Sequence, residues 1–237
     1  MFAVACPSGS AIMPGRMSAP DRIVRDAASI GLATGVYAVS FGVLAVAAGL
    51  SVAQTCALSL LTLTGASQFT FVSVVAAGGS VASAFPPALL LAARNGIYAL
   101  SLKQVLPRSR VRQALDAQLV IDESTAMAHA QPTPERKRRA FLATGVSVFV
   151  LWNLGTLIGA AAGEGLGDPK DLGLDAIFPA VFLALLAPQL RRDGAVGAAI
   201  GGAALAVVLL PLTPAGVPVM VAVLAAIPAL ARRRARG

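Results

Sequence analysis

Residues 52–77 read VAQTCALSLLTLTGASQFTFVSVVAA, an apolar stretch interrupted in its middle by the polar run TLTGASQ at 62–68. About 20 helical residues cross a hydrocarbon core about 30 Å thick, so the stretch is long enough to span a bilayer. Hydrocarbon offers no hydrogen-bond partners, so polar groups inside it must be satisfied by the protein. The stretch therefore predicts a membrane helix that is broken or re-entrant around residues 64–68.

The composition of the whole chain supports a membrane protein. Hydrophobic residues make up 57% of the sequence and charged residues 13%, against roughly 25% charged residues in soluble domains. The apolar runs are continuous, as in AAIGGAALAVVLL at 198–210, which excludes the alternating pattern of a membrane β-barrel. We expect an all-α polytopic integral membrane protein, with residues 1–27 as a disordered cytoplasmic tail and 28–237 as one transmembrane transporter domain. About seven hydrophobic segments are predicted, at 28–50, 52–77, 81–102, 140–163, 174–190, 194–211 and 215–231.

The net charge of +8 reflects membrane orientation, because the basic residues are scattered between apolar segments and do not line one face that could bind nucleic acid. They concentrate in the loop 103–139, at 191–192 and at the C-terminus. Basic loops remain on the cytoplasmic side of a membrane. We therefore expect a basic cytoplasmic loop at 103–139 and a cytoplasmic C-terminus.

The charges also bear on segment 52–77. Arg16, Arg22 and Arg25 favour a cytoplasmic N-terminal tail, but three full crossings would then place the basic loop 103–139 outside. Two half-helices, 52–63 and 67–77, entering and leaving on the same face would remove the conflict. The alternative is a continuous second helix with the tail outside.

A broken helix can form a binding site. Transporters use the N-terminus of a half-helix to bind a carboxylate and unwound carbonyls to bind a cation. Here the candidates are Thr64, Gly65, Ser67 and Gln68, with Phe69, Phe71 and nearby aliphatic side chains as the apolar part of the site. Alternatively, the hydroxyl groups bond back to their own helix or to a neighbour.

Arg94 is a charge inside a predicted membrane segment, in PALLLAARNGIYALSL at 87–102. A central arginine costs about 2.5–3.5 kcal/mol on insertion scales, so it should face a cavity or a partner. Apart from Asp175 at the edge of segment 174–190, the predicted segments contain no acidic residue that could pair with it. Its expected partner is a carbonyl of the break or a substrate carboxylate; alternatively, it clamps the broken helix. Asn95 and Tyr98 extend the polar stripe.

Small residues recur at four-residue spacing, with Gly31 and Gly35 in one segment and Gly155 and Gly159 in another. Such spacing lets membrane helices approach closely. An enzyme is not expected, because the predicted segments lack histidine and the chain lacks HExxH and GxSxG motifs. No cofactor or metal site is expected either.

Five motifs in order resemble the AzlC family, the large subunits of bacterial branched-chain amino acid exporters: GASQF at 65–69, ARxxxYxLSL at 93–102, DES at 122–124, WxxGTxxG at 152–159 and GLDAIFPAVFLALL at 173–186. The resemblance implies export of valine, leucine, isoleucine and sometimes methionine across the bacterial inner membrane. It also implies a proton-motive driving force and a small second membrane subunit of the AzlD type.

The chain departs from the family at one position of interest. Family members often have histidine where this chain has Asn95, so any proton transfer by that histidine must use another group here. Asp122 and Glu123 could carry protons if they were desolvated; otherwise they are solvated loop residues. Two other functions remain open, an importer of the same or other small amino acids and a structural subunit whose partner carries the transport.

Overall fold

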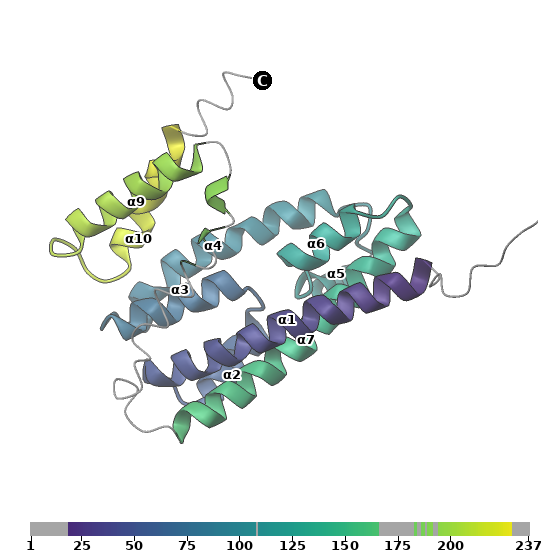
Figure 1. Cartoon of the computed structure of the whole chain (residues 1–237), viewed down its shortest axis with the longest axis horizontal. Coiled ribbons are helices and arrows are strands. Elements are labelled where there is room, and N and C mark those ends of the chain that lie inside the picture. The colour runs from purple at the N-terminus through teal and green to yellow at the C-terminus, as the bar shows by residue number, and fades with distance from the viewer. Residues whose placement is uncertain are drawn as a thin grey trace, which may run out of the picture.

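The computed structural model describes residues 19–107, 109–165, 183, 186–187, 189–191 and 194–228, and all regular structure in this part of the chain is helical (Figure 1). This agrees with the all-α fold expected from the composition. The α-helices are α1 (Ala19–Ala47), α2 (Val52–Leu61), α3 (Gly65–Ala76), α4 (Val81–Ser101), α5 (Arg110–Ala117), α6 (Asp122–His129), α7 (Pro134–Glu164), α9 (Ala195–Leu209) and α10 (Val217–Ala222). The described residues also include the short 3-10 helices η2 (Gln189–Arg191) and η3 (Val223–Ala226).

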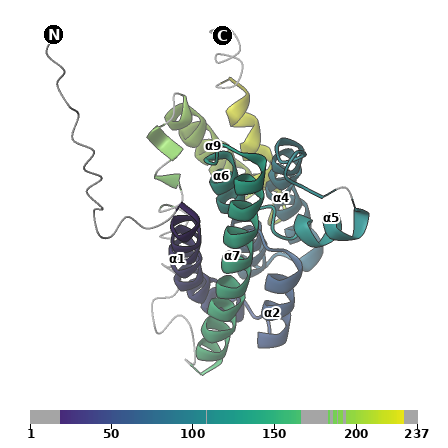
Figure 2. The same cartoon turned by 90° about the vertical axis from the view of Figure 1, so that its right-hand side faces the viewer.

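Helices α1 and α7 lie side by side along most of their length (Figures 1 and 2). Their contact is made by small residues, as the glycine spacing predicted. A Cβ atom added to Gly155 would press on the carbonyl oxygen of Gly35, and one added to Gly159 would press on that of Val39. Only glycine allows these two backbones to approach so closely.

The predicted break in segment 52–77 is confirmed. Helix α2 ends at Leu61 and α3 begins at Gly65, so the two helices are separated by residues 62–64. Figure 1 shows α2 starting beside the end of α1, running to the middle of the molecule, and α3 returning to the side from which α4 starts. The pair forms a hairpin with its tip half-way along the molecule, which contradicts the continuous-helix alternative.

Several boundaries differ from the prediction. Helix α1 begins at Ala19, within the predicted tail, and α7 begins at Pro134 instead of near 140. The early start of α7 has a local cause, because Thr133 caps the helix by accepting from the Arg136 N–H, and proline suits the first helical position. The predicted loop 103–139 contains α5, α6 and the first turns of α7.

Among the described residues, two helices are long and apolar enough to cross a membrane, Arg22–Ala47 and Pro134–Glu164. They correspond to two of the seven predicted segments. Segment 194–211 is helical as α9, and segment 215–231 begins as α10 and tightens into η3. Most of segment 174–190 lies outside the described residues. The structure thus supports a helical membrane protein without establishing seven crossings.

An aromatic cluster packs the hairpin against the long helices. Phe69 of α3 contacts Tyr37 and Phe41 of α1, with ring centroids 5.0 and 5.5 Å apart. Trp152 of α7 stacks on Phe41 at 6.3 Å. Phe41 and Phe69 are fully buried. This cluster forms one side of the hairpin tip and fixes its position between α1 and α7.

Candidate functional site

The end of α2 is held by side chains in place of a continuing helix. The Thr62 hydroxyl donates to the Leu58 carbonyl oxygen at 2.7 Å, and the Gln118 side-chain amide donates to the Leu60 carbonyl oxygen at 2.7 Å. The Gln68 amide donates to the Thr62 carbonyl oxygen at 2.6 Å. The bond from Gln118 satisfies a carbonyl group that the helix break would otherwise leave without a partner. The Leu58 and Thr62 carbonyl oxygens also accept from the backbone N–H groups of Thr62 and Thr64, so the side chains add a second donor there.

Gln68 also joins the break to α7. Its side chain is buried, and its amide oxygen accepts a hydrogen bond of 3.0 Å from the Trp152 indole N–H. The Trp152 ring lies over Gly65, where an added Cβ atom would come within 2.9 Å of it. Gly65 is therefore needed for close approach of the indole, and Gln68 and Trp152 together tie the hairpin tip to the scaffold.

Ser67 follows the break and bonds back to it. Its hydroxyl donates to the Thr64 carbonyl oxygen at 3.0 Å and lies against the Thr64 hydroxyl. The Ser67 backbone N–H also donates to the Thr64 carbonyl oxygen, at 3.0 Å. This is the back-bonding that the sequence left open as an alternative, and it defines the first turn of α3.

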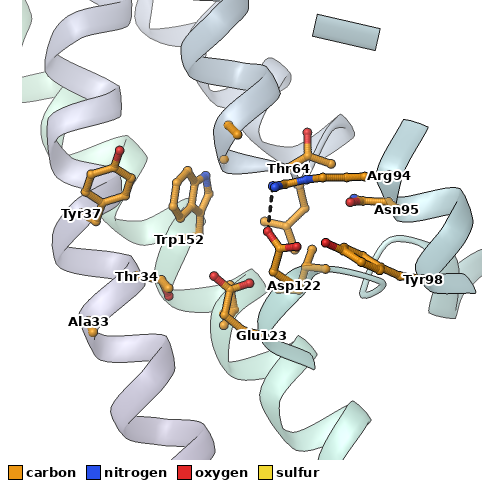
Figure 3. A pocket seen from close by; sticks show the side chains of 15 residues that line it. Ala33, Thr34, Tyr37, Thr64, Arg94, Asn95, Tyr98, Asp122, Glu123 and Trp152 are labelled. Atoms are coloured by element: carbon orange, nitrogen blue, oxygen red, sulfur yellow. Dashed lines mark ion pairs between the residues drawn. The ribbon is translucent and has the colours of Figure 1, made fainter. Parts of the chain in front are cut away.

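An open cavity of about 700 Å³ lies beside the break, bordered by α1, the hairpin tip, α4, α6 and α7 (Figure 3). Its volume falls within the roughly 300–1,000 Å³ of small-molecule sites. It is lined by Ala33, Thr34, Tyr37, Leu63, Thr64, Gly65, Ala66, Arg94, Asn95, Tyr98, Ile121, Asp122, Glu123, Val148 and Trp152.

The cavity brings together most of the candidate residues from the sequence. Thr64, Gly65, Arg94, Asn95, Tyr98, Asp122 and Glu123 all line it. Ser67 and Gln68 instead line a second cavity of about 300 Å³ on the other side of the break. Leu63, Thr64 and Asn95 line both cavities, so the break forms part of the wall between them.

Arg94 has a partner that the sequence did not predict. Its Nη2 atom lies 2.7 Å from Asp122 Oδ2, as Figure 3 shows. Asp122 belongs to the connection between α4 and α7, which folds inward because Ile121 is buried in the core with Phe69 and Trp152. An acidic residue from outside the predicted membrane segments thus takes the place of the expected carbonyl of the break.

Glu123 is half-buried beside this ion pair and points into the cavity (Figure 3). Burial raises the pKa of Glu123 above its usual range, and the charge of Asp122 raises it further, while a backbone hydrogen bond and Arg94 act in the opposite direction. The alternative of a fully solvated loop carboxylate is therefore wrong for Glu123. A raised pKa brings a carboxyl group closer to exchanging protons near neutral pH.

The apolar side of the cavity differs from the expected one. Phe69 is fully buried in the core, and Phe71 lines the second cavity. Leu63, Ile121 and Val148 supply the apolar surface instead. Three further polar or aromatic residues line the cavity, Thr34, Tyr37 and Trp152, which were not among the candidate residues from the sequence. Trp152 carried a signal, since it is the chain's single tryptophan and begins the WxxGTxxG motif.

The cavity contains one guanidinium, two carboxyl groups, amide and hydroxyl groups, and an apolar wall. In the described part of the chain, no group of three or more histidine, cysteine, aspartate or glutamate side chains could hold a metal ion. The arrangement can bind a small molecule that carries both charges and an apolar portion. A polar cavity at a broken helix inside an apolar helical bundle is typical of membrane transport proteins.

Comparison with known proteins identifies the family within this class. The family model described as AzlC protein matches residues 29–166, and the chain belongs to the AzlC family, which is a membrane transport family and not an enzyme family. The matched region runs from α1 to α7 and includes every residue that lines the larger cavity.

Individual relatives are membrane proteins. The chain is 30% identical over 163 residues to "Inner membrane protein YgaZ" of Escherichia coli (strain K12), a match that covers 65% of this chain and 66% of that protein, just under two thirds. It is 33% identical over 187 residues to an "Uncharacterized membrane protein" of Archaeoglobus fulgidus, covering 76% and 80%. A similarly named Helicobacter pylori (strain 26695) protein is 26% identical over 155 residues, covering 65% and 68%. No solved structure matches the chain.

Proposed function

We propose that the chain is the large subunit of a secondary transporter that exports valine, leucine, isoleucine and methionine across the bacterial inner membrane. The observation that carries the proposal is the cavity at the helix break, which is lined by Arg94, two carboxyl groups and aliphatic side chains. A branched-chain amino acid needs an anion site, a cation site and a small apolar pocket. Arg94 would bind the carboxylate, and Asp122 or Glu123 the ammonium group.

Gln68 and Ser67 take supporting roles in this proposal. The Gln68 amide is engaged by Thr62 and Trp152, so it positions the break. The N-terminus of α3 then presents the Gly65 region to the cavity with its positive dipole end, which favours a carboxylate. Thr64, Asn95 and Tyr98 complete the polar wall around the ligand.

The driving force proposed is the proton motive force. Asp122 and Glu123 are the candidate proton carriers, because they lie in the cavity and burial raises the pKa of Glu123. Their position beside the carboxylate-binding Arg94 would let one protonation event change both the charge and the affinity of the site. Asn95 cannot take this role, since an amide does not titrate.

A small AzlD-type membrane subunit is the proposed partner. Helix α4 exposes large apolar side chains along its length, among them Phe85, Leu89, Ile97 and Leu100, which suit contact with lipid or with another membrane helix. Because the α2–α3 hairpin turns back half-way along the molecule, the start of α1 and the connection after α4 lie at the same end of it (Figure 1). We assign that side, and the C-terminus, to the cytoplasm from their basic residues.

An efflux assay tests the proposal. Cells that lack their own exporters are loaded with a valine-containing dipeptide and express the chain with or without its small partner. We expect intracellular valine to fall faster only when both proteins are present, and the effect to disappear in Arg94→Gln. Asp26→Asn serves as a control, since Asp26 lies in an exposed ion pair with Arg25, away from the cavity.

Two outcomes would contradict the proposal. Valine accumulation from the medium would indicate an importer. Unchanged valine efflux by Arg94→Gln and Gln68→Ala proteins that reach the membrane folded would mean that this cavity does not hold the substrate, and that the chain supports transport by its partner.

A further inference from the structure

The ion pair between Arg94 and Asp122 connects two elements that share few other contacts. Arg94 lies in the middle of α4, and Asp122 is the first residue of α6, which packs mainly on α7. The pair lies in the cavity wall, because both residues line the cavity and their side chains are 41% and 42% exposed. A ligand in the cavity can therefore reach both charges.

The ion pair with Asp122 uses only part of the hydrogen-bonding capacity of the Arg94 guanidinium. Asp122 engages Nη2, while Arg94 Nε is shielded from solvent and has no hydrogen-bond partner among the described residues. A guanidinium can donate two parallel hydrogen bonds to one carboxylate, which is its strongest geometry. A ligand carboxylate that engaged two nitrogens would therefore compete well with the single contact to Asp122.

Displacement of Asp122 from Arg94 would disrupt few other interactions. Ion pairs at this exposure contribute little net stability, because water screens them. The start of α6 has separate support, since the Ile121 N–H donates to the Ser124 hydroxyl at 3.2 Å and that hydroxyl donates to the Leu119 carbonyl oxygen at 2.6 Å. Asp122 would thus stay beside the cavity after losing Arg94.

We propose that Asp122 occupies the carboxylate site of Arg94 when no substrate is bound, and that a substrate carboxylate displaces it. The released Asp122 then faces the ammonium group of the same molecule. Binding would exchange one ion pair within the protein for two between protein and ligand. A carboxylate without an ammonium group leaves Asp122 unpaired beside a like charge, so the site selects zwitterionic amino acids. This inference rests on the proposed function, because it takes the substrate to be an amino acid.

The test compares three ligands with the same isobutyl side chain: L-leucine, 4-methylpentanoate, which lacks the amine, and 3-methylbutylamine, which lacks the carboxylate. Binding is measured by calorimetry on the full chain, co-purified with its small subunit in lipid nanodiscs. For the wild-type protein we expect leucine to bind at least about tenfold more tightly than either analogue, because only leucine pairs both released charges. Equal or tighter binding of 4-methylpentanoate would overturn the inference.

The variant Asp122→Asn removes the internal competitor. We expect its affinity for 4-methylpentanoate to rise at least about fivefold, because the ligand no longer displaces a carboxylate or lies beside one. Asp122→Ser provides a second variant if the asparagine protein does not fold. The control Asp26→Asn removes the same charge from an exposed ion pair outside the cavity, and its affinity should not change.

The result distinguishes this inference from the proposed function. If leucine binds the wild-type protein but neither Asp122 variant gains affinity for 4-methylpentanoate, Asp122 does not compete for Arg94 and the inference fails while the substrate assignment stands. If leucine binds neither the folded wild-type protein nor the variants, the proposed substrate is wrong, and the inference fails with it.

Discussion

The α1–α7 pair and the α2–α3 hairpin differ in how their helices are held in place. In α1 and α7 the backbones touch through glycines, and an added Cβ atom would strike a carbonyl oxygen at Gly155 or Gly159. In the hairpin, the helix stops for three residues, and the side chains of Gln68 and Gln118 donate to carbonyl groups beside the break. The first region has no spare space, and the second borders a cavity.

This difference separates scaffold from site. The close-packed pair supplies a fixed surface, from which Tyr37 and Trp152 face the hairpin tip. The hairpin, α4 and α6 then bring polar and charged groups to that surface. Substitutions in the scaffold should therefore affect stability by steric clash, whereas substitutions around the break should affect it through hydrogen bonds and charge.

The largest expected effect is at the glycine contact between α1 and α7. Gly159→Ala should destabilise the protein by about 3 kcal/mol, because the new Cβ atom meets the Val39 backbone, which cannot move without separating the helices. Thermal unfolding in detergent, followed by size-exclusion chromatography, measures the loss. Gly197→Ala in α9 is the matched control; no atom lies within 4 Å of its added Cβ, so stability should be unchanged or rise by up to about 1 kcal/mol. Similar melting of the two variants would refute the close-packed scaffold.

The next effect is at the bond between the hairpin and α7. Trp152→Phe removes the indole N–H and leaves the Gln68 amide oxygen buried without its donor, which should cost about 1–3 kcal/mol. A double-mutant cycle with Gln68→Leu isolates the interaction. We expect a coupling energy of about 0.5–3 kcal/mol, and additive effects of the two substitutions would show that the break is held in another way.

A smaller effect is expected at the start of the hairpin. The Ser51 hydroxyl accepts from the Gln54 N–H at 3.2 Å, and the Gln54 side chain accepts from the Ser51 N–H at 2.9 Å. Ser51→Ala should cost about 1 kcal/mol through loss of this cap. Ser29→Ala, at an exposed serine inside α1 that bonds back to Arg25, controls for loss of a hydroxyl; it should melt like wild type.

The smallest effect is a pH dependence at Glu123. Because the pKa of Glu123 is raised in the folded protein, its stabilising contribution is complete below the unfolded pKa and is lost as the pH rises through the folded value. Glu123→Gln should therefore melt higher than wild type at neutral pH, and the difference should vanish near pH 4. A constant difference across this range would mean that Glu123 titrates as a solvated group.

The helix break could be predicted from the sequence because several polar residues stand together in one apolar stretch, and because a hairpin would place all the basic segments on one side of the membrane. Arg94 could be identified for a similar reason, as a charge too far from a helix end. These are local signals, and the structure places Thr64, Gly65, Arg94, Asn95 and Tyr98 at one cavity.

The partner of Arg94 could not be predicted, because Asp122 lies 28 positions along the chain in a connection that the polar composition assigned to solvent. The inward fold depends on burial of Ile121 against Trp152 and Phe69, a long-range contact without periodic pattern. Phe69 was wrongly predicted to line the site, because it stands beside the polar run in the sequence. That local position could not show that its side chain packs into the aromatic core.

The most direct test asks whether the cavity at the break holds the amino acid. In a chain with Cys6 and Cys56 replaced by alanine, Ala33→Cys places a thiol in the cavity wall, and Ala126→Cys places one on an exposed site of α6 outside it. We predict that saturating L-leucine slows modification of the thiol at position 33 by a water-soluble maleimide and leaves position 126 unaffected. Unchanged modification at position 33, in a sample shown to bind leucine, would place the substrate elsewhere.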